Sequence, residues 1–114
     1  MTDSHSFSAY FKRAVSPLVV LALLRDRTMY GYEISQAMTE RSDGKLSLAL
    51  LYPVLYRLQE QGFIEVTETI VENGRARSYY ALTSAGKQHL ETSVAEFEEL
   101  AAAFQKILHG DVKP

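Results

Sequence analysis

The sequence predicts a mostly helical α+β fold in which three helices are followed by a two-stranded β-hairpin and then by one longer helix. Two patterns lead to this prediction. Apolar residues recur at helical spacing through residues 17–58, and the pattern changes to alternation on both sides of Asn73-Gly74, a dipeptide typical of tight hairpin turns. After Thr83 the helical spacing returns and continues to residue 108 of the 114-residue chain.

The first two helices are predicted from their start and stop signals. Ser16-Pro17 precedes an apolar run that ends at Leu24, so we expect Ser16 to cap a helix that begins at Pro17 and is buried on all sides. Apolar residues spaced by three and four within residues 30–38 indicate a second, shorter helix. The Ser-Asp-Gly sequence at 42–44 predicts the end of that helix.

The third helix is expected to begin at Ser47 as its N-cap and to end before Gly62. Leucines at helical spacing within residues 48–58 form one apolar face, which packs inward. The side chains on or beside the opposite face include Tyr52, Tyr56 and Arg57.

The segments that flank Asn73-Gly74 are predicted to be the two strands of a hairpin. Residues 64–72 and 77–83 alternate between apolar and polar side chains, as half-buried strands do. Three short helices that end in a hairpin are the arrangement of a winged helix-turn-helix domain, in which the hairpin is the wing. We therefore assign residues 1–83 to a winged-helix DNA-binding domain.

Residues 84–114 are predicted to form a C-terminal dimerisation helix that Thr83 caps. Apolar residues spaced alternately by four and three form a heptad seam of almost three heptads, and such a seam packs against a partner helix. Leu100 and Ile107 widen the seam, so packing of the same helix on its own domain stays open as well. The expected dimer interface combines this seam with the first helix and comprises Leu18, Leu21, Leu90, Val94, Phe97, Ala101, Phe104 and Leu108.

Four separated motifs resemble the PadR family of bacterial transcription regulators, in the same order and over nearly the whole chain. They are PLVVLALL, GYEI at Gly31–Ile34, LYPVLYRLQEQGFI at Leu51–Ile64 and RSYYALTSAG at Arg77–Gly86. The resemblance implies a homodimer of winged-helix domains, joined through the first and last helices, that controls nearby genes.

The single short C-terminal helix is similar to that of the small PadR subfamily, some members of which bind flat aromatic ligands between protomers. For a small aromatic effector, the resemblance suggests a pocket formed by Phe11, Phe97 and Phe104. The chain has no tryptophan, the residue that stacks such ligands in the small subfamily.

Seven residues are expected to contact DNA. Tyrosine hydroxyls and cationic side chains donate to phosphates, and arginines on a hairpin tip reach a minor groove. The formal net charge is −2, so the basic footprint has to be local. Residues 73–80 carry two arginines and no acidic residue, so we expect the hairpin tip to have no acid nearby. The expected residues are Lys45, Ser47, Tyr52, Tyr56, Arg57, Arg75 and Arg77.

Four alternatives remain open for these residues. Tyr52 and Tyr56 are equally compatible with packing against the wing or the second helix, and Arg57 with a salt bridge to Glu60. Taken alone, Lys45 is typical of a surface lysine. The turn that carries Arg75 and Arg77 is also compatible with a charged turn that is simply solvated.

The leading functional prediction is a repressor that binds a pseudo-palindromic operator as a homodimer, and the alternative is a protein-interaction module that does not bind DNA. No catalytic constellation is visible, and the chain has no cysteine, so we expect no enzyme. His5, His89 and His109 are too far apart to predict a metal site, and no cofactor motif occurs. We expect a cytoplasmic protein without a membrane partner, because the longest aliphatic run is too short to cross a bilayer.

Overall fold

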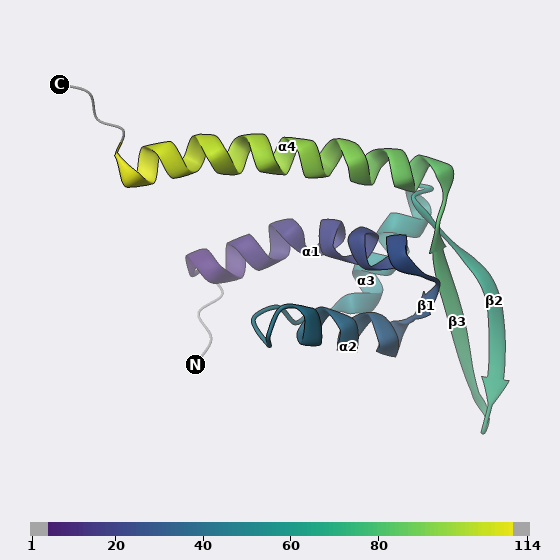
Figure 1. The fold of residues 1–114 in the computed structure, drawn as a ribbon. Helices are drawn as coiled ribbons and strands as arrows, with labels where there is room; N and C mark the ends of the chain where they lie inside the picture. Colours follow the sequence, from purple (N-terminus) through teal and green to yellow (C-terminus); the bar gives the residue numbers. More distant parts are fainter. Residues whose placement is uncertain (1–4, 111–114) are drawn as a thin grey trace.

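The computed structural model describes residues 5–110 and contains four helices and a three-stranded antiparallel sheet of order β1-β3-β2 (Figure 1). Helix α4 lies alongside α1, α2 lies on the other side of α1, and the β2-β3 hairpin extends away from the helices. This is the predicted α+β winged-helix arrangement. The elements are α1 (Phe7–Asp26), β1 (Met29–Tyr30), α2 (Gly31–Arg41), α3 (Leu51–Glu60), β2 (Ile64–Glu72), β3 (Arg75–Leu82) and α4 (Ser84–His109).

The C-terminal half of α1 forms the centre of the hydrophobic core. Each of the other helices and the sheet contributes buried side chains to the same cluster. Full burial of one such aliphatic side chain contributes about 1.5–3 kcal/mol. By length and composition alone α1 is also apolar enough to cross a membrane, but this packing accounts for its apolar half. The most deeply buried side chains are Val20, Leu21, Ile34, Leu55 and Ile64.

Helix α1 begins ten residues earlier than its sequence predicts. Ser6 is the N-cap, and its hydroxyl accepts a hydrogen bond from the amide of Ala9 at 3.1 Å. The prediction that Ser16 caps a helix starting at Pro17 is therefore wrong. Pro17 lies inside the helix, although a proline has no backbone N–H to donate to the preceding turn. The Ser16 hydroxyl donates to the carbonyl of Lys12 in that turn.

Helix α3 begins at Leu51, with Leu50 as N-cap, so the prediction that Ser47 caps it is also wrong. Pro53 supplies the physical reason. A helix that started just after Ser47 would place Pro53 in its interior, where a proline removes a hydrogen bond. The observed start places Pro53 in the first turn, where the amide of a residue has no partner within the helix.

The sheet contains a third strand, β1, which was not predicted because Tyr30 was expected to belong to the second helix. Tyr30 pairs with Tyr79 and Met29 with Tyr80, so this two-residue strand joins the entrance of α2 to the wing. The Asn73-Gly74 turn is confirmed, and both residues have positive φ angles, 51° and 75°.

The start of α4 lies directly on the corner between α3 and β2. Thr83 caps α4 as predicted: its hydroxyl oxygen accepts from the amide of Gly86 at 3.0 Å. The same hydroxyl donates to the carbonyl of Gly62 at 2.6 Å. A Cβ atom at Gly86 would lie 1.9 Å from the carbonyl oxygen of Phe63, so only glycine fits at this position.

We predict that Gly86→Ala lowers the free energy of unfolding by about 3 kcal/mol, because backbone would have to move to admit one methyl group. The same exchange at an open helix position stabilises by up to about 1 kcal/mol, so the sign of the change is diagnostic. Urea unfolding followed by circular dichroism measures it, with Ser84→Ala in the exposed first turn as the control. An unchanged midpoint for Gly86→Ala contradicts the close contact.

Candidate nucleic-acid interface

A cavity of about 570 Å³ lies between the entrance of α2, the outer face of α3 and strand β3 of the wing. Tyrosines and the two wing arginines dominate its lining, which contains no acidic side chain. We call this site the tyrosine cavity. Its lining residues are Tyr30, Gly31, Tyr32, Tyr52, Tyr56, Arg75, Ala76, Arg77, Ser78 and Tyr80.

Helix α3 contributes Tyr52 and Tyr56, whose ring centroids are 6.3 Å apart because one helical turn separates them. Tyr52 is 51% exposed and Tyr56 is 61% exposed, so both present much of their surface to solvent. The Tyr52 hydroxyl would lie 2.5 Å from a Cβ at Gly31, which means that this ring packs over the start of α2. Tyr52 therefore packs on the second helix, as the alternative interpretation expected, and also leaves half of its surface exposed to solvent.

Tyr80 on β3 connects the tyrosine cavity to the hydrophobic core. The side chain is buried, yet it also lines the cavity. Burial raises the pKa of its phenol above the usual value near 10, and the neighbouring Tyr56 and Tyr52 add to the increase. The hydroxyl therefore stays neutral at physiological pH, and a neutral phenol is a hydrogen-bond donor.

The two wing arginines are held differently. Arg77 forms a 3.2 Å ion pair with Glu72, and its guanidinium lies 5.1 Å from the centroid of the Tyr30 ring. The expectation of a hairpin tip without a nearby acid is therefore wrong: hairpin pairing sets Glu72 directly opposite Arg75, two residues from Arg77. Within residues 5–110, Arg75 has no ion pair, so its charge is the more available of the two.

Three of the expected DNA contacts lie outside the tyrosine cavity. Arg57 is exposed on α3 and lines a different cavity, between α3 and α1, and in the described part of the chain it has no salt bridge to Glu60. Ser47 is exposed in the irregular segment before α3 and lines that second cavity as well. Lys45 is exposed in the turn after α2.

Four hydroxyl-bearing residues of the site were not among the expected DNA contacts: Tyr30, Tyr32, Ser78 and Tyr80. Tyr30 and Tyr32 flank Gly31 at the start of α2, and their rings are 6.4 Å apart. The Tyr-Gly-Tyr sequence was a usable signal, because a glycine between two aromatic residues at a helix start indicates close approach of another group. Ser78 carried no signal beyond its place in the strand.

The expected dimer seam divides into a buried and an exposed part. Leu21 and Leu90 are only 1% and 2% exposed inside the protomer, so the prediction that they face a partner is wrong. Leu18 and Val94 are half-buried against the same core, and Ala101 is half-buried further along α4. The remaining apolar side chains of the seam, and two beside it, are exposed: Phe97, Leu100, Phe104, Ile107 and Leu108.

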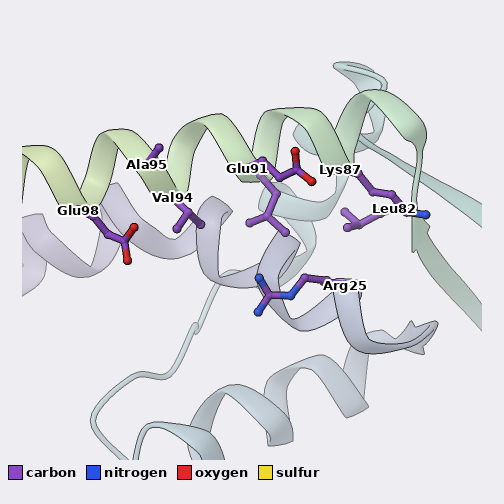
Figure 2. A pocket seen from close by; sticks show the side chains of 8 residues that line it. Arg25, Leu82, Lys87, Glu91, Val94, Ala95 and Glu98 are labelled. Atoms are coloured by element: carbon purple, nitrogen blue, oxygen red, sulfur yellow. The ribbon is translucent and has the colours of Figure 1, made fainter.

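A cavity of about 350 Å³, which we call the α1–α4 cavity, lies between the C-terminal end of α1 and the first half of α4 (Figure 2). Leu82, Leu90 and Val94 supply apolar lining, and charged side chains lie at its edges, including Arg25 of α1. Phe11, Phe97 and Phe104 do not line this cavity, and all three are exposed. The effector pocket expected from them therefore stays a prediction.

Among residues 5–110 no group of three His, Asp or Glu side chains is arranged to hold a metal ion.

Comparison with known proteins gives consistent matches. The Transcriptional regulator PadR-like family matches residues 20–92. Transcriptional regulator Rv3488 of Mycobacterium tuberculosis is 36% identical over 91 residues, covering 80% of this chain and 83% of that protein. Negative transcriptional regulator PadR of Bacillus subtilis is 34% identical over 73 residues, covering 62% of this chain and 40% of that protein. The crystal structure of a PadR family transcriptional regulator from Eggerthella lenta is similar with a TM-score of 0.78 and 25% identity, covering 90% of this chain and 88% of that one.

The matched residues 20–92 begin in the buried half of α1 and end in the buried half of α4. They therefore include the core, the tyrosine cavity and the complete wing. Sequence and architecture agree on the same assignment, and the chain belongs to the PadR-like family of transcriptional regulators.

Proposed function

We propose that this regulator binds double-stranded DNA as a homodimer, through α3 and the wing, and represses transcription from a pseudo-palindromic operator. The tyrosine cavity is the observation that carries the proposal. It gathers hydroxyl groups and two guanidinium groups between a helix and a hairpin, and acidic side chains are absent from its lining. Such donors bind phosphate oxygens, which supply about half to two-thirds of protein–DNA hydrogen bonds.

Each part of the surface has a role in this proposal. The outer face of α3 enters the major groove, and Tyr52 and Tyr56 donate to the phosphates at its edge. Arg75 at the wing tip reaches the adjacent minor groove, where narrow A·T tracts concentrate negative potential. Arg77, which Glu72 and Tyr30 hold in place, donates to the phosphates beside the wing. Arg57 and Lys45 provide cations on either side.

The net charge of −2 does not oppose DNA binding, because the charges are unevenly distributed. Residues 84–114 carry three Lys and five Asp/Glu, whereas residues 1–83 carry equal numbers of basic and acidic side chains. About four phosphate contacts in each protomer neutralise about eight phosphates in a dimer, which corresponds to a log–log salt slope of roughly −7.

The exposed apolar face of α4 supports the dimer part of the proposal. Phe97 and Phe104 are 44% and 48% exposed, although the same helix buries Leu90 within its own protomer. A contiguous apolar face of this kind marks an interaction surface. A second copy of α4 covers it with the same heptad spacing, and the two wings then face half-sites about 34 Å apart. Repression is supported by the name of the Bacillus subtilis relative, a negative regulator.

Removing both wing arginines tests the DNA-binding surface. We predict that Arg75→Ala with Arg77→Ala weakens operator binding at least about 100-fold, because a dimer loses four charge-assisted contacts. The log–log salt slope becomes shallower by roughly 3 to 4 at the same time. Fluorescence anisotropy on a fragment selected from the upstream region of the gene measures both quantities.

A matched control removes a cation elsewhere. Lys87→Ala deletes a charge from the α1–α4 cavity and is expected to leave the affinity within about twofold, apart from long-range screening. If the double variant binds as tightly as the unaltered protein, the two wing arginines do not contribute to DNA binding. If the unaltered protein binds no genomic fragment at low salt but retains a protein partner, the protein-interaction alternative replaces DNA binding.

A charge on the exposed face of α4 tests the dimer. We predict that Phe104→Asp converts the protein to monomers at micromolar concentration, because dimerisation would bury an unpaired carboxylate. Sedimentation equilibrium measures the mass, and circular dichroism checks that the helices remain. Ala102→Asp adds the same charge on the opposite, exposed side of α4 and is expected to stay dimeric. A stable dimer of Phe104→Asp contradicts the proposed seam.

A further inference from the structure

A third cavity, of about 480 Å³, lies between the N-terminal half of α1 and the segment that leads into α3. Its volume is in the range of small-molecule pockets. One wall is formed by α1 from Ser6 to Pro17, and the other by residues 47–50 and the first two turns of α3. We call it the α1–α3 cavity. The apolar part of its lining is Ala9, Pro17, Leu48, Ala49, Leu50, Pro53 and Val54.

The charged groups of this cavity all have the same sign. Lys12 and Arg13 belong to the α1 wall and Arg57 to the α3 wall, and no acidic side chain is among the lining residues. The remaining polar groups are serine hydroxyls, of which Ser16 is buried and bonded to the Lys12 carbonyl. Cations on two walls, with aliphatic side chains between them, are complementary to an organic anion.

The cavity is also connected to the DNA-binding helix. Arg57 lies on α3, one residue after Tyr56 of the tyrosine cavity. Leu50, the N-cap of α3, is 69% exposed although it is apolar, and no side chain caps the helix at this residue. A ligand that covers Leu50 and pairs with Arg57 therefore acts on the start of α3 and on one of its cations.

We propose that the α1–α3 cavity binds a small soluble amphipathic anion, with one carboxylate, sulfonate or phosphate group on an apolar body. The anionic group pairs with Lys12 and Arg57, and the apolar body lies against Leu48, Leu50 and Val54. The ligand competes with DNA for Arg57, so it acts as an inducer that releases the operator. This regulatory step rests on the proposed function, whereas binding of the anion does not.

Binding is tested on the full-length protein without DNA, with octanoate as the probe and 1-octanol as its uncharged analogue. We expect octanoate to give saturable amide shifts in NMR spectra at Ala9, Leu48 and Val54. The variant Lys12→Gln lowers octanoate affinity about tenfold, the loss expected for one charge-assisted contact, while Lys12→Arg retains it. Lys87→Gln, which removes a cation from the α1–α4 cavity, leaves the affinity unchanged.

Three outcomes overturn the site: shifts that do not saturate, octanol that binds as tightly as octanoate, or shifts confined to α4. Coupling is measured separately by operator anisotropy, where octanoate is expected to weaken DNA binding of the unaltered protein but far less that of Lys12→Gln. By reciprocity, operator DNA lowers octanoate affinity by the same factor. If octanoate binding saturates but operator affinity is unchanged, only the inducer role is overturned. If the protein binds octanoate but no DNA, the result contradicts the proposed function and not the binding site.

Discussion

Burial of the C-terminal half of α1 is the constraint on which the rest of the structure depends. Val20, Leu21, Leu23 and Leu24 are buried, and α2, α3, the sheet and α4 all contribute side chains to the cluster around them. A chain of 114 residues has room for only one such core, and the other three helices and β3 pack against the same helix. The relative positions of α3 and the wing follow from this shared contact.

The surface site is built directly on the core. Leu51, Leu55 and Leu58 bury one face of α3, which leaves Tyr52 and Tyr56 on the side that faces outward. Tyr80 is buried by the same packing, and its strand pairs with both β1 and β2. Displacement of α3 from the core would therefore move the tyrosines relative to the wing. Under the proposed function, such a displacement weakens DNA binding even when every contact residue is unchanged.

The sequence predicted the features that are set by local chemistry. Thr83 has the cap it was expected to form, and the Asn73-Gly74 turn has the left-handed angles that this dipeptide tolerates. The predictions that helices start at Ser16 and Ser47 were wrong. Serine is a common residue, and a serine is an N-cap only when its side chain accepts a hydrogen bond from an amide of the first turn. The ion pair between Glu72 and Arg77 was not predicted either, because it forms only when the two strands pair across the turn.

Long-range packing decided which apolar residues of α4 are available to a partner. The heptad spacing treats Leu90 and Phe104 alike, yet Leu90 packs on α1 whereas Phe104 lies beyond the core. Helix α1 shows the same division, because its N-terminal half leaves Phe7, Tyr10 and Phe11 exposed. Each long helix thus has one half that stabilises the protomer and one half that the protomer alone leaves exposed to water. Exposed aromatic side chains on both helices are costly in a monomer, so the two exposed halves are the surfaces through which assembly is able to stabilise the fold further.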